Sequence, residues 1–401
     1  MDTVDDYLKP LAYHVELRDY LKVQERELWQ WFASAQAQAD YTERLRLELL
    51  KATYRLDADG HPDLYAAVAE VKTRLALDFP VTLYQAQHSP QPNAALYFIP
   101  GEGHIVFSGP VLTLLTTAEL KSVMGHELAH HHLWGRDNGE FHIADRLLEA
   151  VANDPRASAS HEQTARHYQL YTEIFADRGA LGVTGDVHPV IAGLVKVQTG
   201  LSRVSPQGYL KQAEEIFAQG SVATEGLSHP ETFIRARALA LWQQDRDRAA
   251  EAIRAMIEGP SGLENLDLLG QVRVTQASRG VLEYLLQPKW FRTPAVLGHA
   301  KLFFQDFQPA ARKEPAALAA FKFEEPKLRE YVCYLLLDFV TADPALEETP
   351  LAAALEVSGQ LGLSTEFEKL ATKELKLKAR DLKRIKEQAP ELLAKAEVSN
   401  E

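Results

Sequence analysis

One short motif constrains this chain more than any other part of its sequence: His126-Glu127-Leu128-Ala129-His130. On a helix, residues four positions apart project from the same face, so His126 and His130 can bind one zinc ion together. Glu127 can then reach a water molecule held by that ion. The alternative is a histidine-rich helix end without a metal. The motif predicts a metal-binding helix, and a catalytic zinc needs a third ligand from elsewhere in the chain.

The residues around the motif favour a helix with defined ends. Thr116 and Glu119 have the spacing of a capping box, in which each side chain accepts a hydrogen bond from the other residue's backbone N–H. The helix should run through the motif to Trp134 and end at Gly135.

Glu173 is the candidate for the third ligand. It lies on an expected helix over residues 162–181, where apolar residues surround it, and Asp177 follows one turn later on the same face. Asp177 could accept the N–H of a ligating histidine and so fix its tautomer. In isolation, a glutamate and an aspartate at this spacing would form a solvated acidic face. Downstream of the histidine motif, we expect the ligand role instead.

Composition limits the other possibilities. The chain has 401 residues, 46% of them hydrophobic, which is enough for two or three domains with real cores. The formal net charge of −13, with no long basic run, argues against a nucleic-acid partner. The single cysteine, Cys333, excludes an internal disulfide framework and suits a reducing compartment.

We expect neither a signal peptide nor a membrane span from this sequence. The acidic segment 1–6 lacks the basic and apolar regions of a signal peptide, and the longest apolar run, 331–337, is too short to cross a bilayer. We expect a cytoplasmic protein without a membrane anchor.

Hydrophobic periodicity predicts mostly helices around one small sheet. One or two long helices are expected over 11–55 and another over 63–77. Alternating and β-branched residues predict strands at 81–86, 95–99 and 104–108, which should form a small antiparallel sheet. An edge strand of such a sheet can pair with an extended peptide. Further helices are expected around 247–257, 279–287, 314–322, 326–341, 348–361 and 365–388.

Four ordered segments resemble the zinc metallopeptidase family that includes the HtpX heat-shock protease and the CAAX prenyl endopeptidase. They are Asn93-Ala94, the run 116–130, the ligand segment 173–177, and the segment 228–235, which begins Ser228-His229-Pro230. Glu231 departs from the family pattern, because a second proline is usual there. The HtpX-type and prenyl-peptidase members are membrane embedded, whereas this chain shows no spanning segment and resembles the soluble members.

The resemblance implies a zinc metalloendopeptidase, a gluzincin, with one Zn²⁺ per chain bound by His126, His130 and Glu173. Glu127 would act as general base towards the attacking water and then protonate the leaving amine. His229 and Arg235 are candidates for stabilising the oxyanion or binding substrate. Their alternatives are a loop histidine before proline and a surface salt bridge. A further hypothesis is that His229 caps the zinc in a resting state.

The C-terminal region resembles a TerB-type helical domain more weakly, through residues 334–343 and Leu361-Gly362-Leu363. The expected organisation is an N-terminal helical arm (1–60), a zinc metallopeptidase domain (61–245), a helical linker region (246–325), a TerB-like domain (326–390) and a tail (391–401).

The fold class predicted from these features is mainly α with an α+β catalytic core. A zincin-type domain with a small antiparallel sheet would be followed by an all-helical region. The expected partner is a protein or peptide substrate, with a possible protein partner at the C-terminal helices. The competing interpretation is a low-turnover, zinc-containing chaperone or an interaction scaffold that acts through those helices.

Overall fold

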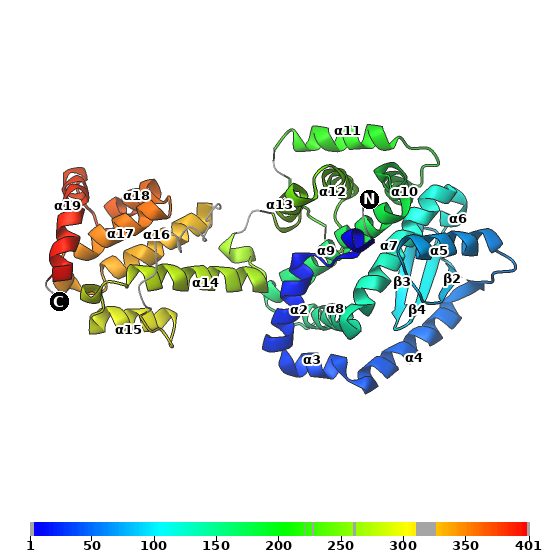
Figure 1. Ribbon diagram of the computed structural model, residues 1–401, viewed down its shortest axis with the longest axis horizontal. Helices are drawn as coiled ribbons and strands as arrows, with labels where there is room; N and C mark the ends of the chain where they lie inside the picture. Colours follow the sequence, from blue (N-terminus) through cyan, green and yellow to red (C-terminus); the bar gives the residue numbers. More distant parts are fainter. Residues whose placement is uncertain (1–3, 221, 227, 260–261, 310–325, 399–401) are drawn as a thin grey trace. The chain divides into compact units, whose positions relative to one another are not determined.

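The computed structural model describes residues 4–220, 222–226, 228–259, 262–309 and 326–398 (Figure 1). The chain divides into two compact units, Met1–Pro260 and Ser261–Glu401. Helix α13 (Arg246–Glu258), in the region expected to be a linker, falls in the first unit. The helix expected over 314–322 lies outside the described residues. Within the described ranges, no helix combines the length and the apolar character needed to cross a membrane.

The first unit contains a four-stranded sheet that is mixed, which corrects the expected antiparallel arrangement. Its strands are β1 (Thr53–Leu56), β2 (Val81–Ala86), β3 (Asn93–Ile99) and β4 (Glu102–Ser108), in the order β1-β2-β4-β3. β2 and β4 are parallel, with Leu83 opposite Ile105, and the other two pairings are antiparallel.

Burial explains this strand order. Five consecutive residues of β4 are buried, so β4 is best placed in the centre of the sheet, with hydrogen-bonded neighbours on both sides. The more exposed β3 then takes the edge. β3 and β4 form an antiparallel hairpin, and β4 runs parallel to its other neighbour β2.

Two long helices form the centre of the first unit. Helix α7 (Thr117–Gly135) carries the histidine motif, and the capping box of Thr116 and Glu119 is present at its start, as predicted. Helix α9 (Ala159–Thr184) begins at the N-cap Ser158 and ends at Gly185 in the left-handed conformation.

α7 and α9 approach each other closely through glycine. A Cβ atom on Gly179 would collide with the side chain of Ala129, and one on Gly125 would collide with Val183. The small residues therefore bring the backbones of α7 and α9 into contact. This crossing places the motif histidines opposite the acidic residues of α9.

The remaining helices surround this pair and the sheet. The N-terminal region expected to form one or two long helices forms three, α2 to α4. Helix α2 buries His14, Leu17 and Leu21 in the unit. Besides α7, α9 and α13, the helices of this unit are α1 (Val4–Leu8), α2 (Ala12–Gln24), α3 (Arg26–Ala33), α4 (Ala35–Ala52), α5 (Pro62–Arg74), α6 (Val111–Leu114), α8 (Glu140–Ala152), α10 (Val187–Thr199), α11 (Pro206–Phe217) and α12 (Thr232–Gln244).

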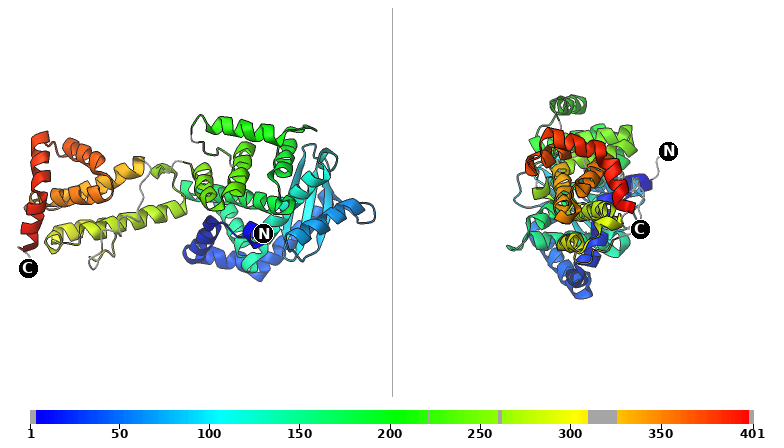
Figure 2. Two further views of the ribbon diagram at one scale, coloured as in Figure 1. Left: turned by 45° about the horizontal axis from the view of Figure 1, so that its top comes forward. Right: turned by 90° about the vertical axis from the view of Figure 1, so that its left-hand side faces the viewer.

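The secondary-structure elements described for the second unit are all helices (yellow to red in Figures 1 and 2). Its helices are α14 (Leu268–Leu285), α15 (Pro294–Phe303), α16 (Pro326–Val340), α17 (Thr349–Gln360), α18 (Ser364–Glu374) and α19 (Ala379–Val398). Cys333 of α16 lies in the core of this unit, and burial raises the pKa of its thiol to about 11. The resemblance of this unit to a TerB-type domain stays a prediction.

Candidate metal centre

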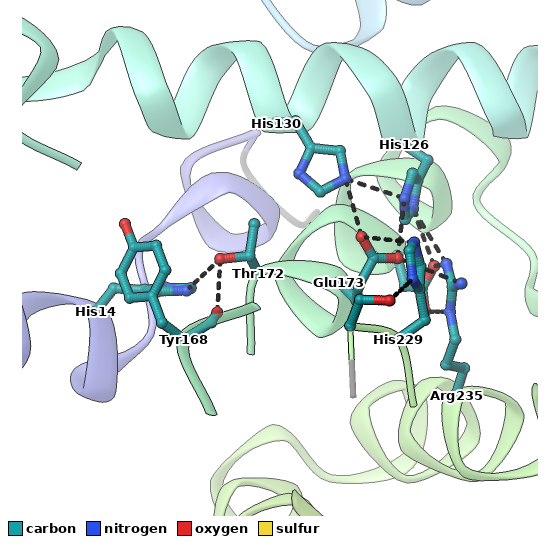
Figure 3. Close-up of polar contacts among 10 residues, drawn as sticks. His14, His126, His130, Tyr168, Thr172, Glu173, His229 and Arg235 are labelled. Carbon is teal, nitrogen blue, oxygen red and sulfur yellow. Dashed lines mark hydrogen bonds and ion pairs between the residues drawn. The ribbon is translucent and has the colours of Figure 1, made fainter. Parts of the chain in front are cut away.

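Three elements of the first unit bring the candidate residues together (Figure 3). Helix α7 supplies His126, Glu127 and His130, which lie within about one turn of each other. Helix α9 supplies Glu173 and Asp177, which lie one turn apart, as the spacing predicted. Helix α12 and the segment before it supply Arg235 and His229.

The donor atoms of His126, His130 and Glu173 converge on one point. His126 Nε2 and His130 Nε2 lie 3.1 Å apart, and each is 3.4 Å from an oxygen of Glu173. In a tetrahedral zinc site, bonds of about 2.0–2.1 Å place neighbouring ligand atoms about 3.3 Å apart. The three side chains therefore have the spacing that one tetrahedral metal ion requires. Within the described ranges, these three residues form the cluster of histidine and acidic side chains whose ligand atoms lie close enough together to hold one metal ion.

Asp177 orients the first of these histidines. Its Oδ1 lies 3.0 Å from His126 Nδ1, and the Asp177 side chain is buried. When Nδ1 carries the proton and donates it to Asp177, Nε2 keeps a free lone pair that points at Glu173. This is the tautomer that a metal ligand needs.

Arg235 joins the two carboxylates of α9. Its Nε donates to Asp177 Oδ2 at 2.8 Å and its Nη2 donates to Asp177 Oδ1 at 2.6 Å, while Nη1 lies 3.3 Å from Glu173 Oε2. Such a two-pronged contact fixes both distance and plane. The guanidinium is buried, so its charge offsets the negative charge of Glu173 and Asp177 where water cannot.

The electrostatics of the centre favour a bound cation. Burial opposes a charge on His126, but Glu173 and Asp177 outweigh this effect and raise the His126 pKa to about 10. Although burial would raise the pKa values of Glu173 and Asp177, His126 and Arg235 hold both of them below the usual range. Glu173 Oε2 is buried and accepts no hydrogen bond from the described residues. A metal ion would satisfy this oxygen.

His229 stands at the exposed side of the centre. Its Nε2 lies 3.6 Å from Glu173 Oε1, its Nδ1 lies 2.9 Å from the Ser228 hydroxyl, and its side chain is 62% exposed. When the Ser228 hydroxyl donates to Nδ1, Nε2 carries the proton and can donate to a group in the cleft. Glu127, in contrast, is buried on α7.

The centre opens into a cleft of about 450 Å³. The cleft is bordered by residues 93–96 of the edge strand β3, by apolar side chains of α10 and by Asp145 and Glu149 of α8. No described strand pairs with the outer edge of β3. Sequence reasoning did not find Asp145 and Glu149, because two acids one turn apart on a helix give the same pattern as a solvated face.

A second polar contact ties the neighbour of Glu173 to the N-terminal arm. His14 Nε2 of α2 lies 3.2 Å from the Thr172 hydroxyl, which in turn donates to the Tyr168 carbonyl (Figure 3). His14 is completely buried, and burial lowers its pKa to about 3. Nothing in the sequence of the arm indicated this contact.

The site combines two histidines on one helix, a glutamate on a crossing helix and a second glutamate inside the motif, which is the arrangement typical of a metallopeptidase centre. Residues 61–243 match the family model of Peptidase family M48, so the chain contains a domain of this family. This match confirms the resemblance seen in the sequence motifs.

One similar protein is the plastoglobule-localized metallopeptidase 48, chloroplastic, of Arabidopsis thaliana. It is 28% identical over 200 residues, which cover 45% of this chain and 57% of that protein. The chain thus spans little more than half the length of this relative. No solved structure shows significant similarity to the chain.

Proposed function

We propose that the chain is a zinc-dependent endopeptidase that hydrolyses protein or peptide substrates in the cleft beside α7. The observation that carries this proposal is the spacing of His126, His130 and Glu173, with Glu127 on the same helix at the same cleft. The donor set suits one Zn²⁺ per chain, with a fourth position open. Bound there, zinc would supply Lewis-acid polarisation of the scissile carbonyl and a lowered pKa of water.

The protein's own groups then have separate roles. The Glu127 carboxylate takes the proton of the attacking water and delivers it to the nitrogen of the leaving amine. Asp177 keeps the proton on His126 Nδ1, so that Nε2 remains available. Arg235 is engaged with Asp177 and Glu173, so we assign it a positioning role instead of the expected contact with substrate.

The substrate would lie in the cleft as an extended chain. β3 has a hydrogen-bonded neighbour on one side, and its other edge can accept a peptide strand. Side chains of that peptide would meet apolar residues at α10 and the acids of α8. His229, exposed above Glu173, would donate from Nε2 to the substrate's carbonyl oxygen as it becomes negative.

Glu127→Gln tests the function directly. We expect cleavage to fall by at least about two orders of magnitude, because the general base is lost, while zinc content stays near one per chain. Glu162→Gln, on an exposed position of α9, is the matched control and should change neither. Proteomic comparison of cells that express wild type or Glu127→Gln would identify substrates as proteins that accumulate in the variant.

Two results would contradict the proposal. Purified protein without stoichiometric zinc would remove the metal centre. A Glu127→Gln variant that retains the biological activity of the wild type would favour the chaperone or scaffold interpretation instead. Loss of that activity on deletion of residues 261–401, with cleavage retained, would assign the scaffold role to the second unit.

A further inference from the structure

We propose that Arg166 and Glu231 are positioning residues that hold His229 over the metal centre. The effect that we expect on catalysis rests on the proposed peptidase function, whereas the positioning of His229 does not. It concerns the His229 loop, defined as residues 224–231, of which 224–226 and 228–231 are described. This loop leads into α12 and carries the exposed His229.

The first contact fixes the loop to α9. Arg166 Nε donates to the Gly226 carbonyl at 2.8 Å, and Arg166 Nη2 donates to the Thr224 carbonyl at 2.6 Å. Arg166 and Glu173 are seven residues, or two turns, apart on the same helix, so they share one face. The Arg166 side chain therefore fixes the position of the loop backbone relative to the proposed ligand Glu173.

The second contact closes the loop on itself. Glu231 Oε2 accepts a hydrogen bond from the Thr224 hydroxyl at 2.6 Å, and Oε1 accepts one from the Glu225 backbone N–H at 2.9 Å. Thr224 is buried, and its backbone N–H donates to the Met256 carbonyl of α13 at 2.8 Å. The carboxylate of Glu231 thus joins the two ends of the loop, and the backbone of Thr224 anchors them to α13.

Glu231 is one of the residues at which this chain departs from the family sequence pattern, because a second proline is usual at this position. A proline at this position has no side-chain acceptor and could make neither contact with Thr224 and Glu225. The departure therefore has a structural use in this chain. It replaces the stiffness of a proline ring with a carboxylate that holds a specific loop conformation.

The local geometry shows why His229 depends on these contacts. The loop turns back so tightly that a Cβ atom on Gly226 would collide with the His229 carbonyl oxygen. The His229 side chain is 62% exposed, and its polar contacts are with Ser228 and Glu173. An exposed side chain with so little packing keeps its position only if its backbone is fixed. Arg166 and Glu231 supply that constraint.

The same contacts extend to the positioning residue Arg235. Glu231 directly precedes α12, and Arg235 lies one turn into that helix, where it binds Asp177. Arg166 and Asp177 both belong to α9. The loop and the start of α12 are therefore attached to α9 at two points, one on either side of His229.

A double-mutant cycle with His229 tests the proposal. We expect Arg166→Met and Glu231→Gln each to lower kcat/KM by on the order of ten- to a hundredfold, because His229 is displaced from the reacting group. Zinc content and affinity should remain those of the wild type. In a His229→Ala background, either substitution should cost less than about threefold, since the residue that it positions is already gone. Losses that multiply independently in the double variants would overturn the proposal.

Hydrogen exchange provides a readout that does not depend on cleavage. The amide of Glu225 should exchange faster in Glu231→Gln and Arg166→Met, while amides in the centre of α9 keep their protection. Arg166→Lys should restore part of the protection, because one donor can still reach the loop. Arg156→Met, at an exposed arginine before α9, is the control and should leave the loop amides unchanged.

The two readouts separate failure of the proposal from failure of the proposed function. Unchanged exchange at Glu225 in both variants would overturn the positioning role. If the wild type itself cleaves no peptide but the exchange result is as expected, the peptidase function fails and the positioning of His229 stands.

Discussion

Arg235 shows how a single buried side chain allows the candidate metal centre to hold two acidic residues. Glu173 and Asp177 are both buried and lie one turn apart on α9, so in isolation they would repel each other. Arg235 contacts both carboxylates. Burial alone would lower the pKa of Arg235, but the attraction of Asp177 and Glu173 outweighs burial and raises it, so the guanidinium stays charged. The centre can therefore keep two ionised carboxylates ready when no metal is bound.

Replacement of Arg235 should weaken the centre without unfolding the chain. We expect Arg235→Lys to reduce zinc affinity and kcat/KM by on the order of 10- to 100-fold, because an ammonium group cannot bind Asp177 with two donors while contacting Glu173. Arg237→Lys, two residues further along the same helix, is the matched control. Competition with a chromophoric chelator would measure the affinity, and equal affinities for Arg235→Lys and wild type would contradict the positioning role.

Part of the site could be predicted because its geometry is local. His126, Glu127 and His130 lie on one helix, so their spacing alone places them together. The same is true of Glu173 and Asp177. The pairing of Arg235 with Asp177 joins residues 58 positions apart and depends on how α12 packs. No periodicity in the sequence carries that information.

At the scale of elements, the crossing of α7 and α9 determines whether the proposed metal ligands meet. His126 and His130 lie on one helix and Glu173 on the other, so any change in the separation of the helices changes the ligand spacing. Gly179 of α9 lies so close to Ala129 of α7 that a Cβ atom on Gly179 would collide with it. Small side chains at the contact are thus a requirement of the site as well as of the fold.

Gly179→Ala should separate the two helices. Alanine improves helix propensity by about 1 kcal/mol, but its methyl group would collide with Ala129, and overpacking costs about 1–3 kcal/mol or more. We expect net destabilisation of the first unit and at least a tenfold loss of zinc affinity, measured by denaturant unfolding and metal competition. In α15, Gly298→Ala has open space and should be neutral or stabilising. A Gly179→Ala variant that binds zinc normally would show that the crossing tolerates a shift.

Element types were easier to predict from the sequence than their arrangement. The capping box, the strand segments and the helical C-terminal region follow from local patterns. β1 was missed because residues 53–56 continue a helical periodicity, and they become a strand only by pairing with β2. The parallel pairing of β2 and β4 was missed because nothing local in β4 specifies which strand lies beside it.

At the scale of the whole molecule, two buried histidines make stability depend on pH. Burial lowers the pKa of His14 to about 3 and that of His142 to about 3, against about 6.5 in an unfolded chain. Between pH 6.5 and pH 3 the unfolded chain therefore binds more protons than the folded chain. The contribution of these two histidines to the free energy of unfolding is complete above pH 6.5 and is lost as the pH falls. Asp145 acts in the opposite direction, because burial raises its pKa to about 7.

His14→Gln should isolate one of these contributions. Between pH 7 and pH 5 the wild type should lose about 2 kcal/mol of stability through His14, and the variant should not show this loss. Denaturant unfolding at the two pH values measures the difference. Identical pH dependence in the variant and the wild type would show that His14 becomes protonated in the folded state.

Metal removal should affect one unit of the molecule. A ligand present at a hundred times its Kd stabilises the fold by about 2.7 kcal/mol, so chelation should lower the melting temperature of the first unit by several degrees. The second unit, whose described residues contain no comparable ligand group, should melt unchanged. Calorimetry with and without chelator would test this.

The cytoplasmic location stays a prediction. The structure bears on it through one observation, that no described helix suits a membrane.

The burial of Cys333 has a practical consequence for spectroscopy. Its thiol lies in an apolar core and ionises only at high pH, so it should react very slowly with maleimides or methanethiosulfonates at pH 7. Since it is the single cysteine of the chain, the natural sequence already serves as an unreactive background. One cysteine introduced at the exposed Glu225 could then carry a spin label or fluorophore. Such a probe would follow the His229 loop during turnover without further substitutions.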